Sequence, residues 1–394
     1  MSPWRFILTF GLVSLLADMV YEGARSIIGP YLTTLGASAA VVGVVAGAGE
    51  FLGYGLRVAS GYAVVRSHHY WFWTILGYAL TVFSVPAIGA TGALAPALIL
   101  YGTERLGKAV RSPAKDTLLS YAAARTGRGS AFGVHQALDQ TGAVLGPLLL
   151  AAVLSWREGD YRLAFAVLLA PGVLVLAMLV WLHRRVPDPR DYETEPANAP
   201  SSRAGADVGT PAEALPRVFW HYVALIALLS VGVISFPLLA FHAHTLGLLS
   251  DAQIPLLFAL AMAIDGASGP IVGGLYDRRG ALVLLGAPVA AAASTLALST
   301  STALVWVGVA AWAVVNGILD STVKAVVTEL VPGRRRAVAF GWLAFVRGAG
   351  LLVAGIVLGL TYQIGREWTI ILILLANAGA LIGLALILPR TVAR

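Results

Sequence analysis

Three ionisable residues interrupt an apolar stretch near the N terminus. Asp18, Glu22 and Arg25 recur at helical spacing, which places them on one stripe of a helix with Tyr21 beside it. In lipid, each charge would cost about 2.5–3.5 kcal/mol, so each needs a partner, a cavity or a function. Arg25 cannot fully neutralise two acids. The spare carboxylate is our leading candidate for a proton carrier, and a salt bridge with a purely structural role is the alternative.

A second group of charges lies in the apolar stretch 93–117. Glu104 and Lys108 are one helical turn apart and can pair with each other. Arg105 points away from their stripe, and we expect it to partner Glu50 or Asp139 on neighbouring helices. These side chains are candidates for contact with a bound molecule.

A histidine and a carboxylate, His135 and Asp139, lie one turn apart, on the same helix face as Gly142 and Gly146. Such a pair can pass a proton or hold a divalent cation, because imidazole titrates near neutrality. The alternative is a hydrogen-bonded pair that only holds this helix in place. The sequence leaves both readings open.

The C-terminal part of the chain carries fewer charges in apolar stretches. Asn316, Asp320 and Lys324 form one stripe, in which we interpret Asp320 and Lys324 as a structural pair. Asp265 and Arg347 are the expected cavity residues, paired with each other or with acids of the first half.

The elements that must position these residues are membrane helices. Of the 394 residues, 58% are hydrophobic and only 12% are charged, which is more apolar surface than a soluble core can bury. A spanning helix needs about 20 residues, and about twelve apolar stretches of that length are present. We expect spans near 5–35, 39–65, 70–90, 93–117, 129–154, 161–183, 217–247, 253–275, 280–300, 303–331, 336–361 and 367–388.

The distribution of arginine predicts the orientation in the membrane. Most loop arginines fall in alternate breaks, whereas the opposite breaks hold only Arg157, Arg162 and Arg366. The positive-inside rule then places both termini in the cytoplasm. The net charge of +7 therefore indicates contact with anionic membrane lipids and no nucleic-acid partner. The absence of cysteine excludes disulfides and thiolate chemistry.

The chain is predicted to consist of two related halves. Thr34-Leu35-Gly36 recurs as Thr245-Leu246-Gly247, and Ala131-Phe132-Gly133 recurs at a similar offset as Ala339-Phe340-Gly341. A proline-rich polar segment separates the copies and indicates a flexible linker. We expect a six-helix bundle at 1–183, a cytoplasmic linker at 184–216 and a second six-helix bundle at 217–394.

Two motifs carry a family resemblance. The run from Gly273 through Asp277 and Arg278 to Gly280 is similar to the loop signature of the major facilitator superfamily, whereas the first-half counterpart has Val65 in place of the acid. Gly142 with Gly146-Pro147 resembles the glycine-proline motif of drug-proton antiporters. The run Arg105–Asp116 resembles a branch of bacterial facilitators that includes metal-resistance exporters. The resemblance implies an all-α fold of twelve transmembrane helices in two pseudo-symmetric bundles.

The resemblance also implies transport by alternating access in the bacterial cytoplasmic (inner) membrane. We expect proton-coupled antiport that exports small organic compounds or drugs. The alternatives are export of divalent metal cations, through Asp18, Glu22, His135 and Asp139, and transport of organic anions or zwitterions, which Arg25, Arg105 and Lys108 fit better. We expect no cofactor, no resident metal and a monomer. No nucleophile or metal motif of an enzyme is present, and a non-transporting receptor is the remaining alternative.

The expected roles fall into three sets. Proton coupling is expected of Asp18, Glu22, His135 and Asp139. Substrate contact is expected of Tyr21, Arg25, Glu50, Glu104, Arg105, Lys108, Asp265, Asn316 and Arg347. Gating is expected of Gly142, Gly146, Pro147, Gly273, Asp277 and Arg278.

Overall fold

A computed structural model describes residues 1–123, 126, 128–188, 192, 215–332 and 335–392, and the regular elements of these residues are all helical. The α-helices are α1 (Pro3–Thr34), α2 (Ala39–Ser67), α3 (Tyr70–Thr91), α4 (Leu94–Ala123), α5 (Arg128–Trp156), α6 (Tyr161–Val167), α7 (Leu169–Arg185), α8 (Arg217–Val231), α9 (Phe236–Thr245), α10 (Gln253–Arg279), α11 (Gly286–Ala293), α12 (Thr302–Leu330), α13 (Arg336–Ile364) and α14 (Arg366–Val392). The 3-10 helices η2 (Gly280–Leu285) and η3 (Ser294–Leu298) flank α11.

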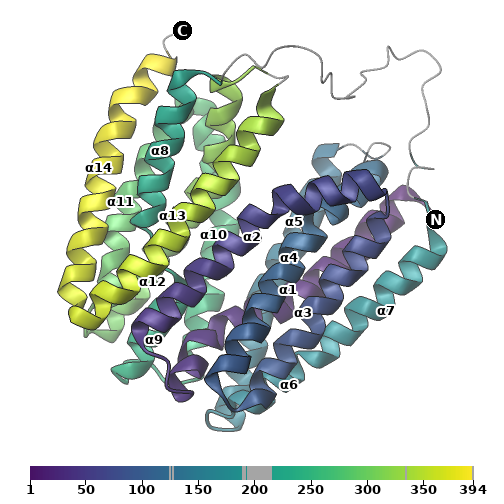
Figure 1. Ribbon diagram of the computed structural model, residues 1–394, viewed down its shortest axis with the longest axis horizontal. Helices are drawn as coiled ribbons and strands as arrows, with labels where there is room; N and C mark the ends of the chain where they lie inside the picture. Colours follow the sequence, from purple (N-terminus) through teal and green to yellow (C-terminus); the bar gives the residue numbers. More distant parts are fainter. Residues whose placement is uncertain (124–125, 127, 189–191, 193–214, 333–334, 393–394) are drawn as a thin grey trace.

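The helices form two bundles, α1–α7 and α8–α14, which lie side by side (Figure 1). The repeated tripeptides end equivalent helices with the same turn. Gly36 and Gly247 both adopt positive φ, 85° and 61°, which glycine tolerates without steric strain. Their amides donate to the carbonyls of Thr33 and His244 at 2.9 and 3.0 Å. The two copies of the motif therefore fold alike.

Ten helical segments within the described residues are long and apolar enough to cross a membrane. One of them, Gln253–Leu298, contains both α10 and α11 and is 46 residues long. The 30-residue α4 is not among the ten, because Glu104, Arg105, Lys108 and Arg111 lower its apolar character. The count of twelve spans and the cytoplasmic placement of the termini stay predictions. Most of the expected linker, at 189–191 and 193–214, lies outside the described residues.

The span expected at 217–247 is interrupted, because α8 ends at Val231 and α9 begins at Phe236. Non-helical backbone at membrane depth must find partners inside the protein. Asn377 Nδ2 donates to the Gly232 carbonyl at 2.9 Å, and Trp312 Nε1 donates to the Ile234 carbonyl at 2.8 Å. These side chains stabilise a break beside the junction of the bundles.

The bundles contact each other closely at one end of the molecule. There α2 packs against α13 and α1 against α9, and Figure 1 shows α2 and α13 converging at the lower edge and diverging toward the upper one. A Cβ on Gly43 would lie 2.9 Å from Cα of Gly359, and one on Gly355 would lie 2.9 Å from Cα of Gly47. Only glycine permits this backbone approach. We call this contact the glycine seam.

Candidate functional site

Two cavities of about 990 and 380 Å³ lie between the bundles on the open side of the glycine seam. The larger is lined by α2, α5, α10, α12 and α13, and the smaller reaches inward to α1 and α4. Tyr54, Gln140 and Arg347 border both, so the two form one continuous site. The larger cavity has the size of a pocket for a small organic molecule.

In the charge cluster of α1, one of the two acids has no ion-pair partner among the described residues. Arg25 lies 3.1 Å from Glu50 Oε1 and 3.5 Å from Glu22 Oε2, so it bridges these two carboxylates. Asp18 lines the smaller cavity, and no cation of the described residues lies within ion-pair distance of it. The spare carboxylate expected from the sequence is therefore that of Asp18.

Arg105 is 2% exposed and lies behind the cavity wall. Its Nη1 donates to the Tyr21 hydroxyl and lies 3.4 Å from Glu50 Oε1, while its Nε lies 3.1 Å from Glu104 Oε2. Of the two partners expected for Arg105, Glu50 is correct and Asp139 is wrong.

The expected pair of Glu104 with Lys108 is also wrong, because Glu104 pairs with Arg105 and Lys108 Nζ lies 3.7 Å from the centre of the Tyr21 ring. Glu104 and Arg105 border neither cavity. They hold Tyr21 and Glu50 in place from behind, whereas Lys108 lines the smaller cavity.

His135 and Asp139 approach each other, with Nδ1 of His135 3.7 Å from Oδ2 of Asp139. The other ring nitrogen, Nε2, lies 2.9 Å from Ser14 Oγ, and the ring is 4% exposed and borders neither cavity. Asp139 does line the smaller cavity and lies 3.8 Å from Lys115 Nζ. Within the described part of the chain, no three His, Asp or Glu side chains gather closely enough to hold a metal ion.

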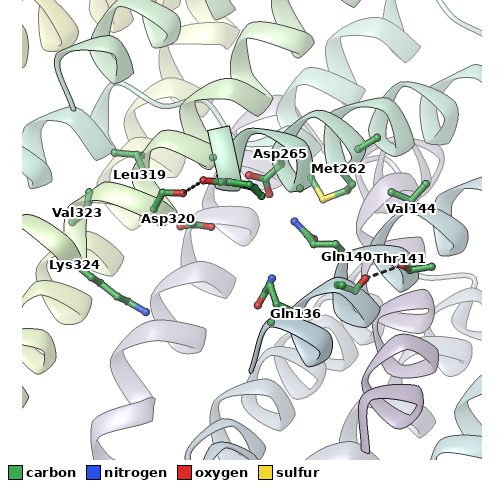
Figure 2. A pocket seen from close by; sticks show the side chains of 18 of the residues that line it. Gln136, Gln140, Thr141, Val144, Met262, Asp265, Leu319, Asp320, Val323 and Lys324 are labelled. Carbon is green, nitrogen blue, oxygen red and sulfur yellow. Dashed lines mark hydrogen bonds between the residues drawn. The ribbon is translucent and has the colours of Figure 1, made fainter. Parts of the chain in front are cut away.

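The charges of the second bundle pair differently from expectation. Asp320 Oδ1 accepts a hydrogen bond from Arg347 Nη1 at 3.0 Å, so the expected pairs Asp320–Lys324 and Asp265–Arg347 are wrong. Asp265 borders both cavities, and Figure 2 shows the side chain of Gln140 directed toward it from the other bundle. Asn316 lines the smaller cavity, and its Nδ2 donates to the Trp312 carbonyl at 3.0 Å.

The glycines of α5 pack within one bundle. A Cβ on Gly142 would lie 2.9 Å from Cα of Leu15, and one on Gly146 would lie 2.8 Å from Cα of Met19. Gly142 and Gly146 therefore let α5 approach α1, with Pro147 following in the helix interior.

The loop signature occupies the end of α10 on the open side. Gly273 has free space around it, and Asp277 and Arg278 are exposed. No ion pair within the described residues includes either side chain. In this conformation they do not join the two bundles.

Sequence reasoning missed several residues that line the larger cavity. Arg57 carries the same signal as Arg25, a charge inside an apolar stretch, and could have been found in that way. Tyr54, Gln136 and Gln140 have no such signal, because uncharged polar side chains are common in membrane helices. Only the packing of the bundles brings them to the cavity.

A family model described as Major Facilitator Superfamily matches residues 10–355. The chain belongs to this superfamily. An uncharacterised protein of Mycobacterium tuberculosis is 44% identical over 99% of this chain and 95% of its own length. An uncharacterised MFS-type transporter of Methanocaldococcus jannaschii is 24% identical over 91% of this chain and 89% of its own.

Solved transporters share the fold of this facilitator. The nucleoside transporter NupG matches with a TM-score of 0.71, at 11% identity over 98% of each chain. A bacterial homologue of the human lysosomal transporter Spinster, in an inward-facing and occupied conformation, matches with a TM-score of 0.66, at 18% identity over 100% of this chain and 96% of that one. The facilitator is thus a multi-pass transporter of the cytoplasmic membrane and not an enzyme.

Proposed function

We propose that this facilitator exports small organic compounds in exchange for protons, by alternating access of the cavity between its bundles. The observation that carries the proposal is Asp18, a carboxylate that faces the cavity without an ion-pair partner among the described residues. A carboxylate that takes up a proton while the cavity is open to one side of the membrane, and releases it while the cavity is open to the other, couples proton movement to the conformational cycle.

The surroundings of Asp18 support this role. Lys108 and Lys115 line the same cavity as Asp18, and Asp139 lies beside Lys115. A change in the charge of Asp18 therefore alters the electrostatic potential at side chains that a bound substrate would also contact. Glu22 is held by Arg25 at 3.5 Å and is less free to change its charge. We therefore assign the coupling proton to Asp18, with Asp139 as the second proton-carrying group.

An organic substrate fits the site better than a metal ion. A cavity of about 990 Å³ is far larger than a coordination sphere needs. Divalent metal sites require several converging ligands, and the described residues hold no group of three. The proposed direction, export, rests on the glycine-proline sequence of α5, which resembles that of drug-proton antiporters.

The test is transport in proteoliposomes that contain a trapped pH dye. A panel of cationic, anionic and zwitterionic organic compounds is first ranked by thermal shift, since a ligand that binds the folded state raises the melting temperature. The compound with the largest shift is then added to the vesicles. The wild-type protein is expected to move protons against this compound, and Asp18→Asn is expected to abolish that movement.

Two controls separate coupling from folding. Glu367→Gln changes an exposed carboxylate at the start of α14, outside both cavities, and should leave proton movement intact. Asp18→Asn should still exchange labelled for unlabelled substrate, because that exchange needs no net proton. Wild-type proton movement in the Asp18→Asn protein would contradict the assignment.

A further inference from the structure

Guanidinium groups from both bundles flank one aromatic ring in the larger cavity. Cζ of Arg57 lies 5.2 Å from the centre of the Tyr54 ring, and Cζ of Arg347 lies 5.5 Å from it. Tyr54 and Arg57 belong to α2, whereas Arg347 belongs to α13. Each bundle therefore places a positive charge against this ring, and the two like charges repel each other unless other groups neutralise them.

Of these two arginines, only one has a carboxylate partner among the described residues. Arg347 is held by Asp320 at 3.0 Å. No carboxylate of the described residues lies within ion-pair distance of Arg57, and its buried Nε has no hydrogen-bond partner. A buried N–H without an acceptor is destabilising, and a ligand oxygen that accepts its hydrogen bond would remove this cost.

A second cation without a carboxylate partner lines the same cavity. Lys324 lies one helical turn beyond Asp320 on α12 and is exposed, and Figure 2 shows its side chain extending into the open space of the pocket. No described carboxylate lies within ion-pair distance of its Nζ. Arg57 and Lys324 thus place two cations outside any ion pair of the described residues on the walls of one pocket, against one such carboxylate, Asp265.

The remaining walls suit the body of an organic molecule. Val144, Met262 and Val323 supply apolar surface, and the amides of Gln136 and Gln140 supply hydrogen-bonding groups. A bare inorganic anion would leave this surface unused. A molecule with one anionic group and an apolar body would use both parts of the pocket.

We propose that Arg57 and Lys324 form an anion subsite, so that the substrate is an organic anion that carries a carboxylate or phosphate on an apolar body. This assignment of substrate class rests on the proposed function. A planar guanidinium can bind two oxygens of such a group at once. Because Arg57 belongs to the first bundle and Lys324 to the second, the bound anion would draw the bundles together on the open side.

The experiment measures binding of matched probes to the purified full chain in an uncharged detergent. The probes are 4-phenylbutyrate, its neutral primary amide, 4-phenylbutylamine and phenylpropyl phosphate. We expect the two anions to raise the melting temperature and the amide and amine to leave it unchanged. Comparing the melting temperatures with 4-phenylbutyrate and with phenylpropyl phosphate shows which anionic group the protein prefers.

The variants test the two cations separately. Arg57→Gln should weaken binding of the preferred anion by about 10- to 100-fold, the usual contribution of a hydrogen bond to a charged group. Lys324→Gln should weaken it as well, and it changes an exposed side chain that folding does not require. Arg366→Gln is the matched control, since this arginine pairs with Glu367 outside both cavities and should bind like the wild type.

Equal shifts from the carboxylate and its amide, or wild-type anion affinity in both Arg57→Gln and Lys324→Gln, would overturn the subsite. The proton assay keeps the two proposals distinguishable. Proton movement driven only by cationic compounds would overturn the subsite and leave the coupling by Asp18 standing. Anion binding that depends on Arg57 but moves no protons would overturn the coupling and leave the subsite standing.

Discussion

The hydroxyl of Tyr161 donates a hydrogen bond of 2.7 Å to Oδ1 of Asp251, joining the two bundles at the end where the glycine seam closes. Tyr161 begins α6 in the first bundle, and Asp251 precedes α10 in the second. His244 Nδ1 lies 3.1 Å from the same carboxylate oxygen. We call these three residues the clasp.

The clasp should favour the closed state of this end. Tyr161→Phe removes the hydrogen bond between the bundles and keeps the ring. We expect the closed state to lose about 1 kcal/mol, near the low end for a bond to a carboxylate that is 32% exposed. The chain has no cysteine, so spin labels at Ser155→Cys and Ser250→Cys report the separation of the bundles without background labelling. Unchanged distance distributions in Tyr161→Phe would remove the clasp from the gating mechanism.

The hydrogen bond between Tyr161 and Asp251 should depend on pH only under acidic conditions, because its acceptor is the Asp251 carboxylate. The interaction with His244 lowers the pKa of Asp251 below its usual value of about 3.9. The carboxylate is therefore ionised at any pH above that value, and its contribution disappears only as the pH falls through the lowered pKa. The same spin-label distances should stay constant from neutral pH down to about pH 5 and lengthen below pH 4. Lengthening near neutrality in Asp251→Asn as well as in the wild type would show that another group controls this end.

The glycine seam should not tolerate a larger residue. In Gly43→Val the new side chain would meet the backbone of α13, where Cα of Gly359 lies 2.9 Å from the Cβ position. We expect the free energy of unfolding to fall by about 1–3 kcal/mol, as at other overpacked sites, and the bundles to separate more often at this end. Gly53→Val on the same helix is the matched control, because no atom lies within 4 Å of its Cβ position. Equal melting temperatures for the two variants would contradict the seam.

The buried Arg105 should be essential for stability. Arg105→Gln leaves Glu104 without its cation in a nearly dry environment and removes the partner of Tyr21. We expect the free energy of unfolding to fall by about 3–5 kcal/mol, which is typical when one partner of a buried ion pair is removed. The double variant Arg105→Gln with Glu104→Gln should recover part of it. Thermal unfolding in detergent measures both, and a wild-type melting temperature for Arg105→Gln would show that this cation is not needed.

Sequence reasoning located the charges of the site better than their partners. Asp18, Glu22 and Arg25 were found because helical spacing is fixed, and Asp18 lines the cavity as expected. The partners of Glu104 and Arg347 were misjudged, because ion pairs depend on how the side chains and helices rotate and cross. Those angles follow from the packing of many side chains and leave no local pattern.

The sequence by itself determined that this protein lies in a membrane, that it is helical and which family it belongs to. Apolar length and the loop signature are local properties of the sequence, and the need for long apolar helices follows from the cost of leaving polar backbone groups unsatisfied in lipid. Only the tertiary structure decided which acid is unpaired, that Arg57 and Lys324 face one cavity, and that Tyr161 reaches Asp251. Those relationships join helices far apart in the chain, so they depend on how the helices pack and leave no local pattern in the sequence.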